Sequence, residues 1–172
     1  SRYFAFPFDP ENLRQKIEKE YQVCDVNQDY RLRVTLSKYG EMKLSRQILS
    51  PLSPSFCKAK LCLQEADLNQ SFTYFKTTHR PHLNLGEQEK IYHNARGELL
   101  ESSIGNLVLK IAGKLYTPPI RLGILPGIYR QYLLETGEVE EKVLTLKDLV
   151  QAEAIYGCNA VRGLYELSLE EN

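Results

Sequence analysis

The sequence predicts an α+β fold arranged as two lobes. Three observations lead to this prediction: a helix with a clear start signal early in the chain, short runs of alternating apolar and polar residues, and turn signals between those runs. A polar stretch at residues 67–70 separates two differently patterned halves. We therefore expect a small lobe over residues 1–69 and a larger lobe over residues 70–172.

The small lobe is expected to begin with a helix at residue 10. Asp9 can cap the free N–H groups, Pro10 suits the first helical position, and Glu11 lies in the first turn. One face of this helix carries three apolar side chains, Leu13, Ile17 and Tyr21. The segment therefore has both a start signal and a face that can pack.

Three strands are expected to accompany this helix. Apolar and polar residues alternate between residues 30 and 38, which is the period of a half-buried antiparallel strand. Gly40 then turns the chain into a second strand that carries Met42 and Leu44. After a loop rich in proline and serine, alternation over residues 59–63 predicts a third strand. One helix against three strands makes a small α+β lobe.

The large lobe is expected to consist mainly of short strands. The candidate strands are residues 72–75, 91–93, 99–100, 104–111, 115–117, 154–156 and 164–167. Residues 94–97 predict a hairpin turn. One helix should begin after Gly127 and end at Gly137, and a shorter one should be capped by Thr145.

Composition excludes several classes of function. Lys+Arg 22 equals Asp+Glu 22, so nothing in the net charge attracts nucleic acid or anionic lipid. No apolar run approaches the roughly 20 residues that cross a bilayer, and the first residues do not resemble a signal peptide. Four cysteines and three histidines lack the spacing of a metal site or a disulfide framework. We therefore expect a cytoplasmic protein without a bound metal.

Three places could carry chemistry. Lys76 follows an aromatic run, where desolvation would lower the pKa of its amine and make it a nucleophile. Residues 127–129 open a predicted helix, whose free N–H groups favour a phosphate. Polar residues 101–106 open an otherwise apolar strand, and Gly105 allows close approach to the backbone. The ordinary alternatives are a solvated lysine, a simple turn and a solvent-facing strand edge.

The order of six segments joins these places into one pattern. They are residues 75–80, 97–107, 115–119, 123–130, 141–146 and 158–163. In this order they resemble the pyridoxal-phosphate enzymes of fold type IV, and among these most closely the aminodeoxychorismate lyases. The resemblance implies a two-lobed fold like that of D-amino-acid aminotransferase. Relatives have further strands and a helix at the start, including an arginine for the cofactor phosphate, so we expect the small lobe to be incomplete.

The resemblance assigns roles to Lys76 and to the polar residues at 101–106. Lys76 matches the lysine that forms a Schiff base with pyridoxal 5'-phosphate. Glu101 matches the carboxylate that faces the pyridine nitrogen and keeps it protonated, which strengthens the cofactor as an electron sink. Ser103 and Asn106 belong to the same motif and are expected to shape the pocket.

The resemblance also implies a phosphate site and a substrate site. The phosphate of the cofactor would be held by the turn at Gly127, Ile128 and Tyr129, and a second loop at Asn159 and Ala160 would lie on the same side of it. Arg80 and Arg162 are candidates for binding substrate carboxylates, although either could be an ordinary surface arginine. Relatives often have a tyrosine after the lysine that bonds the phenolic oxygen of the cofactor, and Tyr74, Tyr92 or His82 could take its place.

The implied reaction is the conversion of 4-amino-4-deoxychorismate to 4-aminobenzoate and pyruvate, a step toward folate. One alternative is an aminotransferase of the same fold acting on a branched-chain or D-amino acid, and another is a non-catalytic lobe. By analogy with relatives we expect a homodimer that acts on a small molecule, and an aminodeoxychorismate synthase is a possible partner.

Overall fold

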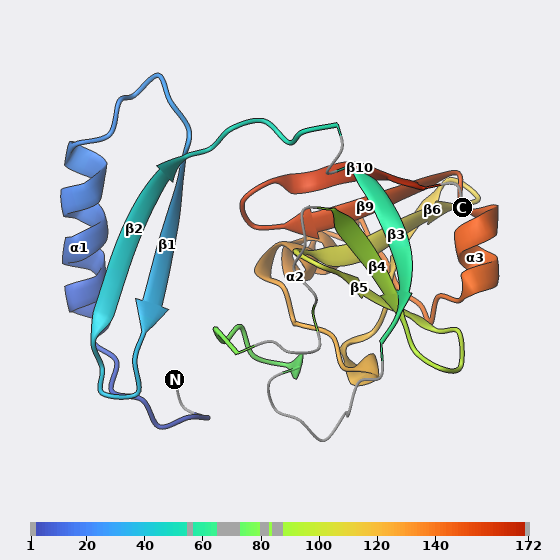
Figure 1. Cartoon of the computed structure of the whole chain (residues 1–172), viewed down its shortest axis with the longest axis horizontal. Coiled ribbons are helices and arrows are strands. Elements are labelled where there is room, and N and C mark those ends of the chain that lie inside the picture. The colour runs from blue at the N-terminus through green and yellow to red at the C-terminus, as the bar shows by residue number, and fades with distance from the viewer. Residues whose placement is uncertain (1–2, 55–56, 65–72, 80–82, 84–87, 171–172) are drawn as a thin grey trace. The chain divides into compact units, whose positions relative to one another are not determined.

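A computed structural model describes residues 3–54, 57–64, 73–79, 83 and 88–170. The chain divides into two compact units, Ser1–Pro51 and Leu52–Asn172 (Figure 1). Each unit has its own sheet, so each is described separately. No helix in the described part of the chain is long and apolar enough to span a membrane.

The first unit is a helix and a two-stranded sheet. Helix α1 (Pro10–Gln22) starts as predicted, because the Asp9 carboxylate accepts hydrogen bonds from the backbone N–H of Glu11 and Asn12 at 3.0 and 3.1 Å. Strands β1 (Tyr30–Leu36) and β2 (Met42–Ile48) pair antiparallel in the predicted hairpin, and α1 contacts β2.

The prediction that residues 59–63 add a third strand to this unit is wrong. These residues do form a strand, β3 (Lys58–Leu63), but it pairs in parallel with β4 (Glu89–His93) and β10 (Gly163–Leu169) of the second unit. The division of the chain therefore falls between Pro51 and Leu52, and not at residues 69 and 70 as expected. Alternation of apolar residues identifies a strand, whereas its sheet depends on partners far away in the sequence.

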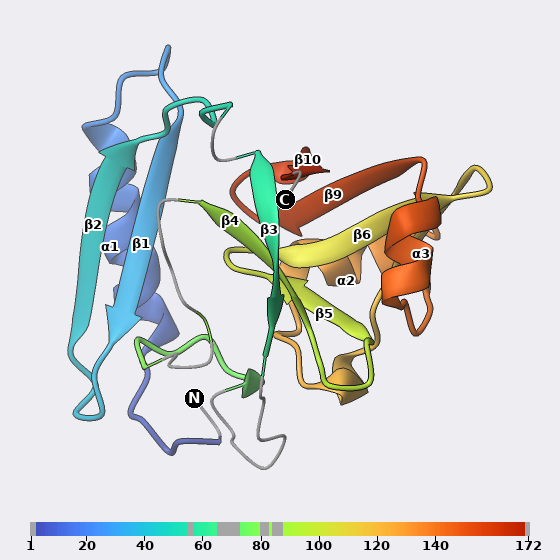
Figure 2. The same cartoon turned by 45° about the vertical axis from the view of Figure 1, so that its right-hand side comes forward.

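The second unit is built around a closed ring of strands. Its remaining elements are β4 (Glu89–His93), β5 (Leu99–Ser102), β6 (Asn106–Ile111), β7 (Lys114–Thr117), a 3-10 helix (Ile120–Leu122), α2 (Ile128–Glu135), β8 (Glu140–Glu141), α3 (Leu146–Gln151), β9 (Ala154–Asn159) and β10 (Gly163–Leu169). The strand order is β5-β4-β3-β10-β9-β6-β7-β8, and a further pairing of β5 with β6 closes six of these strands into a ring. Helix α2 contacts β9, and α3 contacts β6 (Figure 2).

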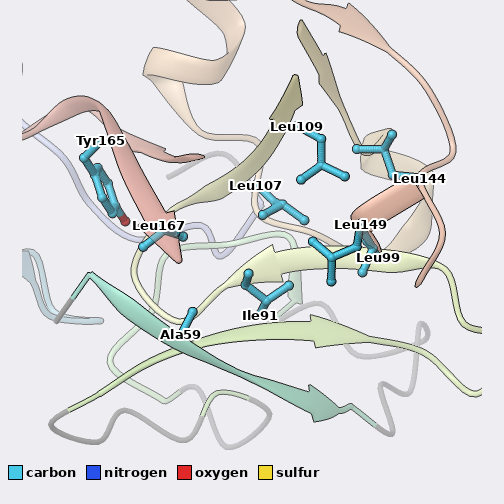
Figure 3. Close-up of a cluster of buried hydrophobic side chains, with 9 residues drawn as sticks. All are labelled: Ala59, Ile91, Leu99, Leu107, Leu109, Leu144, Leu149, Tyr165 and Leu167. Carbon is cyan, nitrogen blue, oxygen red and sulfur yellow. The ribbon is translucent and has the colours of Figure 1, made fainter. Parts of the chain in front are cut away.

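An apolar core fills this ring. Figure 3 shows side chains from β3, β4, β5 and β6 gathered in one cluster, in which Ile91, Leu99, Leu107 and Leu109 are fully buried. Burying one such side chain contributes roughly 1.5–3 kcal/mol. This core therefore fixes the ends of β5 and β6, and with them the polar residues of the turn that joins these two strands.

The expected aromatic strand at residues 72–75 is not formed by its described residues. Thr73, Tyr74 and Phe75 lie in a tight turn, and Phe72 is outside the described residues. The backbone N–H of Thr77 donates to the carbonyl of Phe75 at 2.8 Å, which closes a tight turn around Lys76. The hairpin turn at residues 94–97 and the capping of α3 by Thr145 are confirmed.

Candidate active site

A pocket of about 250 Å³ opens in the second unit. It lies where the turn between β5 and β6 meets the start of α2 and the end of β9. Seven of the predicted site residues line it: Lys76, Glu101, Asn106, Gly127, Ile128, Asn159 and Ala160. Its volume is close to the lower end of the range for small-molecule sites, about 300–1,000 Å³. Tertiary structure thus brings together residues that are up to 84 positions apart.

Glu101 and Asn106 form one wall of the pocket. They are paired across the turn that joins β5 to β6, and both are buried. The Asn106 side-chain amide donates to the Leu125 carbonyl at 2.8 Å, and the Glu101 carboxylate accepts from the Leu125 N–H at 3.3 Å. The loop that leads into α2 is therefore held at a fixed distance from the carboxylate.

The start of α2 forms a second wall. Gly127 is the N-cap and provides no side-chain hydrogen bond to the first turn, whereas α1 and α3 are both capped by side chains. The first N–H groups of a helix have no partner within the helix, and the helix dipole favours an anion at that end. The N–H groups of Ile128 and Tyr129 at this pocket therefore suit a phosphate.

Asn159 orders the loop between β9 and β10. Its side-chain oxygen accepts from the N–H groups of Val161 and Arg162, both at 2.9 Å, while its amide donates to the Ile104 carbonyl at 3.4 Å. These bonds tie the loop to the β5–β6 turn and leave Ala160 exposed in the pocket wall.

Lys76 follows the turn formed by residues 73–75 and lines the pocket. The hydroxyl of Thr77 donates to the His79 carbonyl at 2.6 Å, which shapes the segment after the lysine. The side chain of Lys76 is exposed, so the expected desolvation by an aromatic strand is not present in this unit. Tyr74 and Phe75 nevertheless line the same pocket and give it an aromatic side.

Four predicted site residues are not among those that line the pocket. Ser103 is buried behind it and donates to Glu89 at 3.0 Å. The ring of Tyr129 lies 5.9 Å from that of Tyr132, and Tyr129 follows Ile128, which lines the pocket. Arg162 is half-buried in the loop ordered by Asn159, and Arg80 lies outside the described residues.

The sequence reasoning missed several neighbours of the pocket. Cys158 lines it, and burial raises the pKa of this thiol to about 11, so it stays protonated and unreactive near neutral pH. Arg130 is buried beneath α2, where it donates to the Pro118 carbonyl at 2.8 Å and pairs with Glu141. Its position three residues after the helix cap gave no signal of burial, because arginines in a first helical turn are mostly exposed.

The donor set of the pocket fits a phosphorylated aldehyde that has a basic ring nitrogen. The primary amine of Lys76 can bond to an aldehyde carbon, the buried Glu101 carboxylate suits a protonated ring nitrogen, and the open start of α2 suits a phosphate. Pyridoxal 5'-phosphate has all three features. The fold and the pocket are thus those of the pyridoxal-phosphate family of fold type IV.

Comparison with protein families agrees with this class. The model of the family described as "Amino-transferase class IV" matches residues 1–168, so the chain belongs to that family. Its members depend on pyridoxal 5'-phosphate.

Individual relatives carry different names. A Haemophilus influenzae protein described only as uncharacterized is 29% identical over 79% of this chain and 67% of its own length. The aminodeoxychorismate lyase of Saccharomyces cerevisiae is 26% identical over 85% of this chain. The chain spans only 53% of that lyase. The crystal structure of a proposed amino-acid aminotransferase from Mesorhizobium loti has a TM-score of 0.84 and 27% identity, covering 98% of this chain and 86% of that one.

Proposed function

We propose that this protein is a lyase that converts 4-amino-4-deoxychorismate to 4-aminobenzoate and pyruvate. The observation that carries the proposal is the shared pocket of Lys76 and Glu101, together with similarity to a yeast protein named aminodeoxychorismate lyase. Bound pyridoxal phosphate supplies the electron sink for such a reaction. The remaining steps depend on residues of this chain.

Lys76 is proposed to act twice. Its Nζ would hold the cofactor at the aldehyde carbon until the substrate amine takes that place, and would then be available as a base. The released Nζ removes the proton from the substrate carbon that bears the amine. Departure of the enolpyruvyl group, which is released as pyruvate, leaves the ring aromatic.

Glu101 and the start of α2 are proposed to orient the cofactor. The Glu101 carboxylate holds the proton on the ring nitrogen, and its bond to the Leu125 N–H keeps it in place. The N–H groups of Ile128 and Tyr129 bind the phosphate. Asn106 and Asn159 hold the surrounding loops, and Ala160 offers its backbone.

The carboxylates of the substrate are proposed to bind arginine. Arg162 is half-buried in the loop beside the pocket, and Arg80 follows Lys76 by four residues. A guanidinium group can bind a carboxylate through two parallel hydrogen bonds, so one arginine per carboxylate suffices. Replacing either arginine should raise KM more than it lowers kcat.

The test is a direct assay of both products. The purified protein is loaded with pyridoxal phosphate, mixed with 4-amino-4-deoxychorismate, and followed for pyruvate and 4-aminobenzoate in equal amounts. The Lys76→Ala variant serves as the control for protein-dependent turnover. Amino-group transfer to a keto acid without pyruvate release would contradict the lyase proposal.

The second candidate is an aminotransferase for a branched-chain or D-amino acid. It is favoured by the similarity to the Mesorhizobium loti protein, whose chain is covered more fully than that of the yeast lyase. Transfer of the amino group from such an amino acid to 2-oxoglutarate would support it. A third candidate is a non-catalytic lobe, which predicts a protein that stays colourless when the cofactor is added.

The assembly and location of the protein are also proposals. By analogy with relatives of this fold we propose a homodimer with an aminodeoxychorismate synthase as partner, and from the sequence pattern we propose a place in the cytoplasm. Sedimentation of the purified protein at several concentrations tests the dimer. Co-purification with the synthase from cell extract tests the partner.

A further inference from the structure

A second buried carboxylate lies directly behind the pocket. Glu89, at the start of β4, is fully buried, although it does not line the pocket. Its Oε1 accepts a hydrogen bond from the Ser103 hydroxyl at 3.0 Å and another from the Ile104 N–H at 3.3 Å. Both donors belong to the turn between β5 and β6. Glu89 therefore binds the turn that connects two pocket residues, Glu101 and Asn106.

Ser103 reinforces this connection. Its hydroxyl oxygen accepts from the Lys90 N–H at 3.2 Å, and its own N–H donates to the Lys90 carbonyl at 3.0 Å. The Ser103 hydroxyl thus donates to Glu89 and accepts from Lys90 at the same time. These bonds join the beginning of β4 to the turn through both side chains and backbone.

The turn has little freedom on its other side. Within it, the Ser102 N–H donates to the Gly105 carbonyl at 2.9 Å. Gly105 lies so close to β9 that an added Cβ would be 2.6 Å from the Cys158 carbonyl oxygen. The turn is therefore held between β4 and β9, and a shift at Ser103 or Ile104 displaces the residues that flank it.

Burying the Glu89 carboxylate has a cost in folding free energy, so its presence at this position calls for an explanation. Burying an unpaired polar group costs roughly 1–3 kcal/mol in protein mutation data, so an apolar residue here would be favoured by stability alone. Burial raises the pKa of Glu89, which favours its uncharged form. The acceptor atom of Glu89, rather than its charge, is the feature that the turn uses.

We propose that Glu89 is a positioning residue of the cofactor pocket, which fixes the turn through Ser103 and Ile104 and so places Glu101 and Asn106. This inference rests on the cofactor pocket proposed above. It goes beyond that pocket because it assigns a role to a residue that does not touch the cofactor.

The experiment compares Glu89→Ala, Glu89→Gln and Ser103→Ala with the unaltered protein. The Glu98→Ala variant is the matched control, because Glu98 also accepts side-chain hydrogen bonds next to β5 but lies at the other end of that strand, directly after the 94–97 hairpin turn. Pyridoxal phosphate is titrated into each protein, and its visible absorption gives the Kd and the wavelength of the band. Borohydride reduction followed by peptide mass spectrometry measures the label on Lys76, and circular dichroism reports folding.

The expected result is a graded loss of affinity for pyridoxal phosphate across the variants. Glu89→Ala should raise the Kd about tenfold or more and shift the absorption band, as loss of an outer-shell partner does in other sites. Glu89→Gln keeps an oxygen that can accept from Ser103 and Ile104, so it should restore the Kd to within about threefold of the unaltered protein. Ser103→Ala removes one bond of two and should lie between them. Glu98→Ala should leave the Kd and the band unchanged.

Three results would overturn the inference. The first is a folded Glu89→Ala protein with an unchanged Kd and band, and the second is a Glu89→Gln protein that binds as weakly as Glu89→Ala. If Glu89→Ala does not fold, Ser103→Ala decides, because an unchanged Kd there contradicts positioning through the turn. The third is absence of label on Lys76 in the unaltered protein, which would overturn the proposed pocket together with this inference. The first two results appear only in the variants, whereas the third appears in the unaltered protein. A failure of this inference can therefore be distinguished from a failure of the proposed pocket.

Discussion

Glu101 and Asn106 bind the same residue, Leu125, one through its N–H and the other through its carbonyl oxygen, at 3.3 and 2.8 Å. The two residues flank one turn, and Leu125 lies 19 positions further along the chain, just before α2. A buried hydrogen bond contributes about 0.5–1.5 kcal/mol, and two on one residue determine its orientation as well. The Glu101 carboxylate and the loop that leads into α2 are therefore held together through one residue, Leu125.

Removal of the proposed nucleophile should abolish activity without unfolding the protein. Lys76→Ala is expected to lower turnover by at least about 10²–10⁴-fold, because the proton transfer assigned to its Nζ is lost. Its side chain is exposed, so the midpoint of thermal unfolding should not change. Product release and calorimetry measure the two quantities. Lys147→Ala, an exposed lysine on α3, is the control and should retain full turnover.

Neutralising Glu101 should separate the effect of its charge on turnover from the effect of its hydrogen bond on stability. Glu101→Gln retains an oxygen that can accept from the Leu125 N–H, so the free energy of unfolding should change by less than about 1 kcal/mol. Turnover should fall about 10²–10³-fold, since the amide cannot hold a positive charge on the ring nitrogen.

Asn106→Ala provides the contrast. It removes the bond to the Leu125 carbonyl and leaves the Glu101 charge intact, so it should weaken cofactor binding more than it changes the absorption band. Steady-state kinetics, urea unfolding and absorption spectra distinguish the variants. A Glu101→Gln protein with full turnover would show that this carboxylate has no role in the reaction.

A side chain at Gly127 should disrupt the pocket wall. An added Cβ would lie 2.1 Å from the side-chain oxygen of Asn106, so Asn106 would have to move and release Leu125. Gly127→Ala is therefore expected to lower the free energy of unfolding by about 1–3 kcal/mol. The affinity for pyridoxal phosphate should also fall by about tenfold, the equivalent of 1.4 kcal/mol.

Equilibrium unfolding and cofactor titration check the Gly127 prediction. The matched control is Gln131→Ala in the same helix, whose exposed bond to Glu135 contributes only about 0.2–0.5 kcal/mol. Equal losses in both variants would mean that Gly127 acts through helix stability and not through Asn106.

Cys158 should make the protein less stable at alkaline pH. Its pKa is raised from 9.0 to about 11 by burial, so the folded state binds a proton that the unfolded state releases. Stability from this group is complete below pH 9 and is lost as the pH rises from 9 toward 11, by about 3 kcal/mol at 1.36 kcal/mol per pKa unit.

The Cys158→Ala variant tests this dependence. It should be less stable at pH 7, because removal of buried atoms leaves a small cavity. Its stability should decline less steeply between pH 9 and 11 than that of the unaltered protein, and urea unfolding at a series of pH values measures both slopes. Parallel slopes would show that Cys158 does not contribute to the alkaline loss.

Local signals in the sequence were sufficient for much of the secondary structure. Asp9 caps α1, Thr145 and Asp148 form a capping box at α3, and residues 94–97 make the hairpin turn, as predicted. Each of these signals involves groups within a few residues of one another, so their energies do not depend on the rest of the chain. For the pocket, the six ordered segments identified seven residues that line it, although their catalytic and binding roles remain predictions.

The sequence by itself therefore determined the helix starts, the turns, most strands and the protein family. Tertiary structure alone decided that β3 joins the second unit, that residues 73–75 turn instead of forming a strand, and that Glu89 lies behind the pocket. The pairing of β3 with β4 and β10 joins segments that are distant in the chain, as does the bond between Ser103 and Glu89. Such contacts form only when the whole sheet closes, because their free energy comes from burial and hydrogen bonds that no short segment contains.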